Sequence, residues 1–293
     1  MLKSMTGYGS HREQDEDCAQ IWEIKSVNAK QLSLKFRLPA LLSPWEPVWD
    51  QKVRRAAERG RVELTLSLQI LRPEMLPLQL NGPALQAMFH QLEHFAEQQG
   101  QPFTPDLNQA LRISGLWQET SIPSESDLGS RLEAGLDKAL SDWDASRSRE
   151  GEALQSDLLE RMERLAAWNA ELQEKSSGLA REKLERLQGR MAELLVQQEA
   201  QPDEQRLLQE MALLADKVDV SEELTRLRAH IDTLQDHLSR GSAGGRKLDF
   251  LLQECFREIN TCGNKAQDTE ISRLVVDLKT ELEKCREQVQ NLE

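Results

Sequence analysis

Apolar and polar residues alternate in the first part of the chain, the pattern of β-strands that bury one face. The clearest stretch runs from Leu32 to Leu38, where apolar side chains alternate with Ser33, Lys35 and Arg37. A similar alternation of Val, Leu and Ile with polar residues follows Gly60. We predict four strands, at residues 3–13, 19–27, 31–38 and 62–70.

Two local signals connect these strands. Residues 28–30 (Asn-Ala-Lys) predict a hairpin turn between the second and third strands. A helix is expected to begin at residues 44–46, with Ser43 as its N-cap, and to end before Gly60. The order predicts an antiparallel sheet with covering helices.

After residue 80 the apolar spacing changes from two residues to three and four, which is typical of amphipathic helices. The predicted fold is therefore α+β, with a long-helix, mostly α C-terminal region after the sheet. We expect an N-terminal domain at 1–155, a long connecting helix at 156–205 and a helical C-terminal domain at 206–293. The predicted helices are 81–99, 107–114, 128–144, 146–199, 204–238, 247–262 and 270–291.

Composition divides the chain at the same place. The 293 residues carry a net charge of −13, of which residues 1–80 contribute +2 (12 Lys/Arg, 10 Asp/Glu) and the remainder −15 (25 Lys/Arg, 40 Asp/Glu). A negative chain argues against general polyanion binding. The heptad-like stretch at 150–200 is more often a helical hairpin or coiled coil than a catalytic element.

Other classes are disfavoured. No run approaches the ~18 apolar residues of a membrane span, and the first residues lack the apolar segment of a secretory signal. The four scattered cysteines fit neither a disulfide scaffold nor a zinc knuckle. We expect a soluble, cytoplasmic protein with no membrane partner.

Two polar stripes remain. On a helical wheel, the segment 204–238 places its apolar residues in one sector and acid, guanidinium and imidazole groups in another. An ordinary solvated face is the alternative, but two of the five histidines of the chain share this stripe. Its members are Asp219, Glu222, Glu223, Arg226, His230 and His237.

The helix at 247–265 carries the second stripe. Amides and guanidinium groups in one column suit phosphate, ribose and base edges, although a helix–helix interface uses the same residues. The stripe consists of Arg246, Asp249, Gln253, Arg257, Asn260 and Asn264, flanked by Glu254, Glu258, Thr261 and Lys265.

If the two stripes face each other, their carboxylates and imidazole could bind Mg²⁺ or Mn²⁺, and histidine favours Mn²⁺. Such an ion activates water for phosphodiester chemistry, while arginine neutralises charge on the phosphoryl oxygens. The predicted metal ligands are Asp219, Glu222, Glu223, His230, Glu254 and Glu258. The predicted catalytic residues are Glu223, His230, Glu254, Glu258 and Arg226.

Several strings resemble the bacterial YicC-like endoribonuclease family, in the same order from end to end. They are residues 4–9 (SMTGYG), 23–28 (EIKSVN), 149–151 (REG), 219–223 (DVSEE), 245–250 (GRKLDF) and 286–293 (REQVQNLE). The chain departs from the family at one point. The family usually has Ser-Lys after Asn260-Thr261, whereas this chain has Asn264-Lys265.

The resemblance implies a metal-dependent endoribonuclease acting on RNA, assembled as a homo-oligomer, in particular a hexamer. RNA is expected to contact Lys25, Lys35, Arg37, Arg246, Gln253, Arg257, Asn260, Asn264 and Lys265. Tyr8 could stack on a base, and Glu150 and Asp157 are motif-matched carboxylates. The alternative is a non-catalytic RNA-binding or coiled-coil adaptor that presents RNA to another nuclease.

Overall fold

The computed structural model describes residues 2–72, 75, 78–119, 122, 126–198, 204–241, 244–266 and 268–293. The chain separates into two compact units. The sheet unit is Gly7–Ser146, and the helical unit combines the residues up to Thr6 with Arg147–Glu293. A single 72-residue helix, α4 (Asp127–Gln198), contributes to both units, where two helices were predicted at 128–144 and 146–199.

A four-stranded sheet in the order β1-β2-β4-β3 forms the sheet unit, which confirms the α+β class. β2 pairs antiparallel with β1 on one side and with β4 on the other. The strands are β1 (Gly7–Gln14), β2 (Cys18–Val27), β3 (Ser33–Arg37) and β4 (Arg61–Ile70).

The predicted hairpin between the second and third strands is wrong, because β3 pairs in parallel with β4 and the sheet is mixed. The helix α1 (Glu46–Ala56) lies between β3 and β4 in sequence. Parallel neighbours need such a crossover, and the helix returns the chain to the end of the sheet at which β3 began. Ser43 is not the N-cap either, since its hydroxyl donates to the carbonyl of Ala40.

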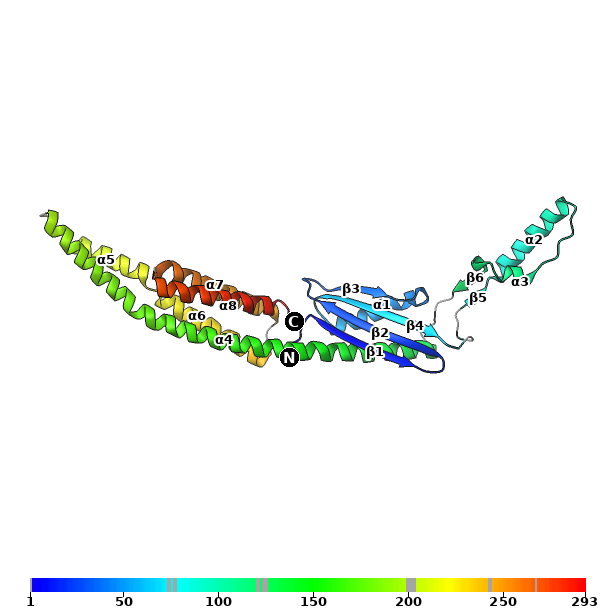
Figure 1. The fold of residues 1–293 in the computed structure, drawn as a ribbon, viewed down its shortest axis with the longest axis horizontal. Coiled ribbons are helices and arrows are strands. Elements are labelled where there is room, and N and C mark those ends of the chain that lie inside the picture. The colour runs from blue at the N-terminus through cyan, green and yellow to red at the C-terminus, as the bar shows by residue number, and fades with distance from the viewer. Residues whose placement is uncertain are drawn as a thin grey trace. The chain divides into compact units, whose positions relative to one another are not determined.

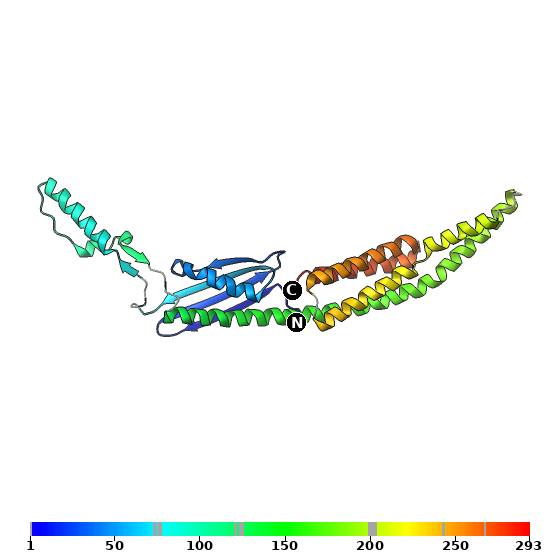
Figure 2. The same ribbon diagram turned by 180° about the vertical axis from the view of Figure 1, so that it is seen from behind.

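Helix α1 and the first part of α4 cover one face of the sheet (Figure 2). Trp22, Trp49 and Trp143 are fully buried between these layers. Gly9 permits the close approach, because a Cβ atom there would lie 2.4 Å from the backbone nitrogen of Trp143. The buried faces are those that the alternation predicted.

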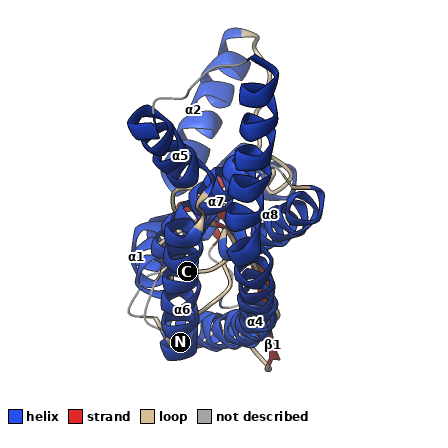
Figure 3. Ribbon diagram, turned by 90° about the vertical axis from the view of Figure 1, so that its left-hand side faces the viewer, coloured by secondary structure: helices blue, strands red, loops and turns tan. Residues whose placement is uncertain are grey.

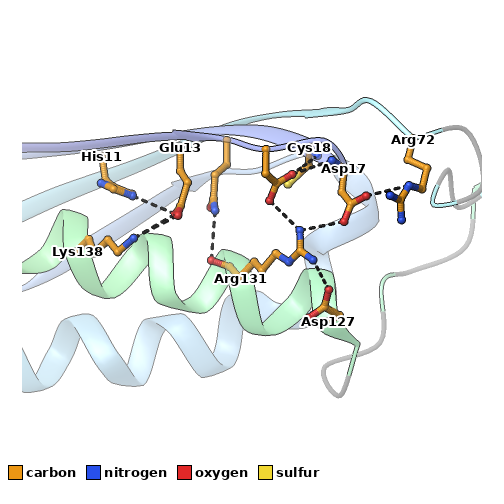
Figure 4. A network of polar contacts seen from close by, with 10 residues as sticks. His11, Glu13, Asp17, Cys18, Arg72, Asp127, Arg131 and Lys138 are labelled. Carbon is orange, nitrogen blue, oxygen red and sulfur yellow. Dashed lines mark hydrogen bonds and ion pairs between the residues drawn. The ribbon is translucent and has the colours of Figure 1, made fainter.

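An ion-pair network joins the β1–β2 turn to the beginning of α4 (Figure 4). Arg131 on α4 donates to Asp15 (2.7 Å) and Asp17 (3.0 Å) in the turn, and to Asp127 one helical turn away (2.5 Å). Arg72, after β4, pairs with the same Asp17 at 2.9 Å. The network therefore fixes the turn, the end of β4 and the start of α4 together.

Residues 78–119, here called the extension, are inserted between β4 and α4. They contain a small sheet of β5 (Leu78–Leu80) and β6 (Trp117–Glu119), neither of which the sequence pattern predicted. Between these strands lie α2 (Gly82–Gln98), α3 (Leu107–Ala110) and the 3₁₀-helix η3 (Ser114–Leu116). None of the residues of α2 is buried.

Four helices share the core of the helical unit: α4, α6 (Ser221–Arg240), α7 (Gly245–Ala266) and α8 (Thr269–Val289) (Figures 1 and 3). Leu224, Leu227, Ile231 and Leu234 of α6 are buried, as their spacing predicted. In the described ranges, no helix combines the length and apolar character that a membrane span needs.

The segment predicted as one helix at 204–238 is two, α5 (Glu204–Val218) and α6. At the break, the Asp219 carboxylate accepts from the backbone N–H and the hydroxyl of Ser221, the first residue of α6 (2.9 and 3.0 Å). These hydrogen bonds lower the pKa of Asp219. The gap between the predicted helices at 146–199 and 204–238 lies outside the described residues.

The two ends of the described chain are joined in the helical unit by Lys3 and Glu293. The backbone N–H groups of Lys3 and Glu293 each donate to the other residue's carbonyl (3.1 and 2.8 Å). Arg147 of α4 is 1% exposed, donates to the carbonyl of Ser4 at 2.7 Å and pairs with the Glu293 carboxylate. Gly151 permits this arrangement, because a Cβ there would lie 2.3 Å from the carbonyl oxygen of Leu2.

The buried thiols of the helical unit predict alkaline destabilisation. Burial raises the pKa of Cys255 and Cys285 to about 12 and that of Cys262 to about 11. Above pH ~9 the unfolded chain releases thiol protons that the folded chain retains, so each thiol lowers the free energy of unfolding by up to about 1.4 kcal/mol per pH unit. Urea unfolding of the parent from pH 7 to 10 measures the slope.

The control is the Cys255→Ala, Cys262→Ala and Cys285→Ala triple variant. It should be less stable than the parent at pH 7 because of lost packing, yet lose less stability between pH 9 and 10. Parallel stability curves for the two proteins would contradict the prediction.

Candidate active site

Helices α6 and α7 run antiparallel, and their shared edge brings together three groups from the predicted stripes. One ligand atom each of His230, Glu254 and Glu258 lies within 4.8 Å of the other two. His230 and Glu254 are half-buried, whereas Glu258 is 6% exposed. His230 precedes the buried Ile231, and both glutamates adjoin the buried Cys255 and Ile259 along α7, so the three groups lie at the margin of the apolar core.

The charge of this group needs compensation. Two carboxylates that lie so close repel each other unless a proton or a cation lies between them. Arg257 pairs with Glu254 at 3.5 Å, but none of the described lysines or arginines lies within ion-pair distance of Glu258. Two carboxylates and an imidazole form a donor set that divalent Mn²⁺ or Mg²⁺ accepts, so the residues present fit such an ion.

A second pair lies about two helical turns away along the same edge. Lys265 of α7 donates to the Glu223 carboxylate at 2.7 Å and to the carbonyl of Asp219 at 3.1 Å. The hydrogen bond to Glu223 raises the pKa of Lys265 and keeps it protonated. The Oε2 atom of Glu223 is buried without a hydrogen-bond partner in the part of the chain that the structure describes.

The remaining α6 candidates lie apart from the three-residue group. Glu222 is exposed and pairs with Arg226 one turn along the helix. Asp219 accepts from Ser221 at the start of α6, as described above. The structure therefore places Asp219, Glu222 and Glu223 in other interactions and brings only His230, Glu254 and Glu258 together as possible ligands among the described residues.

Only the flank of the α7 stripe faces α6; the central column is exposed. Exposed members are Arg246, Gln253, Arg257, Asn260 and Asn264, and the side chain of Arg257 is 72% exposed. Gln253 donates to the Asp249 carboxylate at 2.8 Å. Asp249 also forms an ion pair with Arg286. Phe250 lies on the same face, although the sequence pattern assigned it no role. The only feature of the sequence that could have indicated a functional role is that an aromatic residue stands among polar ones.

The outer face of the sheet carries the other predicted RNA contacts. Lys25 lies over the Tyr8 ring, 5.6 Å from its centroid, and pairs with Glu23 at 3.2 Å. Arg37 pairs with Glu63 at 2.5 Å, and Lys35 is exposed. The cations of this face are thus partly neutralised by carboxylates of the same sheet.

The two motif-matched carboxylates of α4 have local partners. Glu150 accepts from the Thr6 hydroxyl at 2.5 Å, which joins the predicted SMTGYG and REG motifs within the helical unit. Asp157 pairs with Arg161 at 2.7 Å, and Arg161 also reaches the buried Glu281 at 2.8 Å. These contacts give both carboxylates a structural role within the helical unit.

The fold has two parts, an N-terminal α+β region and a helical C-terminal region that carries the acidic α6–α7 edge. Family models described as "Endoribonuclease YicC-like, N-terminal region" and "Endoribonuclease YicC-like, C-terminal" match residues 2–156 and 172–293. The chain belongs to the YicC-like endoribonuclease family.

Two curated relatives share the whole chain. One, from Haemophilus influenzae, is 33% identical over 293 residues and covers all of both proteins. The other, from Clostridioides difficile, is 34% identical over 303 residues, again over the full length of both. Each is named "Probable endoribonuclease YicC".

Proposed function

We propose that this protein is a metal-dependent endoribonuclease that cleaves RNA phosphodiester bonds at the α6–α7 edge and serves RNA turnover in the cytoplasm. The observation that carries the proposal is the group of His230, Glu254 and Glu258, whose ligand atoms lie within 4.8 Å of one another. Family membership supports the reaction, and the donor set supports the metal, with Mn²⁺ favoured by the imidazole.

A divalent ion held by these three side chains would supply a polarised water molecule or phosphate oxygen. Glu258, which is nearly buried, fixes the inner side of the site, and the half-buried Glu254 is open to the substrate. Arg257 lies one turn from Glu254 and can donate to a phosphoryl oxygen as charge develops on it.

Further contacts with the RNA come from two surfaces. On α7, Arg246 and Lys265 offer cations, and the exposed amides Gln253, Asn260 and Asn264 offer hydrogen bonds to sugar or base edges. On the sheet unit, the exposed face carries Tyr8 with Lys25 over its ring, and Lys35 and Arg37 on the far edge strand β3; we propose that this face guides single-stranded RNA.

The test uses the purified full chain, stripped of metal by a chelator and resupplied with Mn²⁺, Mg²⁺ or Ca²⁺. Internal cleavage of an end-labelled RNA should return with Mn²⁺, and the equivalent DNA should stay intact. RNA binding without cleavage under every metal condition would instead support the adaptor alternative. A 5′-phosphate product would indicate attack by water, and a 2′,3′-cyclic phosphate would indicate attack by the 2′-hydroxyl.

We also propose that the protein self-associates, as the hexamer that the family resemblance implies, and that the extension is one of the contact surfaces. Eight of the fifteen exposed large hydrophobic residues of the described chain lie within residues 78–119. They are Leu78, Leu80, Leu92, Phe95, Leu107, Leu111, Ile113 and Trp117. At about half exposure each, eight such side chains offer on the order of 700 Å² per chain, close to the ~800 Å² per partner of a standard interface.

The composition of the extension favours a second copy of the chain, rather than RNA, as its binding partner. Its 42 residues include five charged ones, and Arg112 is the only Lys or Arg among them. Ala110 and Leu116 are its buried apolar residues in the described chain, and neither belongs to the core clusters of the two units. A segment with so few buried apolar residues needs a binding partner to stabilise it. A second copy of the chain is always present and can serve as that partner.

Charge on α2 predicts how this surface can be disrupted. Replacing both Leu92 and Phe95 by Asp should shift the protein to a smaller assembly in light scattering coupled to gel filtration, because each Asp would be buried unpaired at the interface. Gln86→Asp with His90→Asp adds the same charge to the opposite side of α2 and should leave the size unchanged. If both double variants keep the parent size, the extension is not an interface.

A further inference from the structure

We infer that Phe250 is a base-stacking residue that binds a nucleobase beside the scissile phosphate, an inference that rests on the proposed RNA cleavage at the α6–α7 edge. The ring is 58% exposed, although it lies on a helix whose other face forms the core. After Trp168 the chain has only two aromatic residues, Phe250 and Phe256. Phe256 packs against the core, so Phe250 is the ring that remains available to a ligand.

Its neighbours on α7 are those of a nucleic-acid contact. Side chains three, four and seven residues apart share one face of a helix. By that spacing Phe250 lies beside Arg246 on one side and beside Gln253 and Glu254 on the other, with Arg257 one turn further. An apolar ring is thus surrounded by guanidinium and amide groups, the combination with which proteins bind unstacked bases and their phosphates.

The position relative to the metal-ligand candidates follows from the same spacing. Glu254 belongs to the three-residue group, and Phe250 precedes it by one helical turn, so their Cβ atoms lie about 5–6 Å apart. A phosphate at the three-residue group therefore places one of its flanking nucleotides over the ring. Every base has a stacking face, so this contact holds the strand in register without demanding a particular sequence.

Two variants and a control test the contact in the full-length protein. Phe250→Ala should raise KM for a short single-stranded RNA by about 5- to 150-fold, the range expected for one lost base stack, with a smaller change in kcat. Phe250→Trp should restore the parent KM. Val276→Ala removes a comparably exposed apolar side chain, 60% exposed on α8, and should have no effect.

A double-mutant cycle separates stacking from other roles. An abasic nucleotide, introduced at each position of the RNA in turn, should weaken binding to the parent at one position next to the cleaved bond. The same abasic RNA should bind Phe250→Ala no more weakly than the intact RNA does. Equal penalties for parent and variant at every position would overturn the inference, as would a change in assembly size on Phe250→Ala, which would identify a protein contact.

The outcomes also separate this inference from the proposed function. If the parent cleaves RNA with Mn²⁺ and Phe250→Ala is indistinguishable from it, the stacking contact is refuted while the cleavage site stands. If the parent fails to cleave under every metal condition, the proposed function itself fails.

Discussion

Glu258→Gln should lower the rate of RNA cleavage at least about 100-fold, the upper end of the loss that follows when the second shell of a metal site is disturbed. The amide retains the shape of the side chain but loses the charge that a divalent ion needs. The variant should fold, because a neutral group at a position 6% exposed costs less desolvation energy than a carboxylate. Glu254→Gln and His230→Ala should act in the same direction.

A readout other than activity comes from thermal unfolding. Mn²⁺ should raise the melting temperature of the parent and leave that of Glu258→Gln unchanged, because an ion that binds only the folded state stabilises it. Without metal, Glu258→Gln should melt at or above the parent temperature, since the repulsion between Glu254 and Glu258 is removed. Glu283→Gln on α8, which neutralises an exposed carboxylate, is the control. Parent-like cleavage by Glu258→Gln at saturating Mn²⁺ would refute the site.

Arg147→Met should lower the free energy of unfolding of the helical unit by about 3–5 kcal/mol, the loss expected when one partner of a buried ion pair is removed. Methionine fills a similar volume, but it removes the guanidinium that donates to the Ser4 carbonyl and pairs with the Glu293 carboxylate. The exposed Arg149 lies two residues along the same helix, so Arg149→Met is a matched control. Its effect should stay within about 0.5 kcal/mol.

Denaturant unfolding followed by circular dichroism compares the two substitutions. Coupling with Glu293 is tested by Glu293→Gln, alone and together with Arg147→Met. If the pair acts as one unit, the double variant should be no less stable than Arg147→Met by itself. Equal stability of Arg147→Met and Arg149→Met would show that the buried contact between the two ends of the chain contributes nothing.

Local patterns in the sequence predicted most elements of the fold. The alternation around Phe36 and Leu64 placed both strands, since one face of each lies against the core. Strand pairing depends on the connection instead, and the crossover through α1 made β3 a parallel edge strand. The break between α5 and α6 was missed because it does not disturb the apolar spacing on either side.

The candidate site was predictable for a related reason. His230, Glu254 and Glu258 lie beside the apolar residues of their own helices, so the spacing that builds the α6–α7 contact also brings them together. Helical wheels describe one helix at a time, and they did not show that Glu223 would pair with Lys265 or that the centre of the α7 stripe would face outward. Which flank meets the partner helix depends on how the two helices are rotated against each other.

The pairing of Lys3 with Glu293 has a consequence for synthesis on the ribosome. A chain emerges from its N-terminal end, so the sheet unit, Gly7–Ser146, is available to fold while the α6–α8 segment is still being translated. Residues 2–6 must wait for Asn291 and Glu293 before Arg147 is enclosed. The sheet unit can therefore form early during synthesis, whereas the helical unit encloses Arg147 only once residues 291–293 have been added.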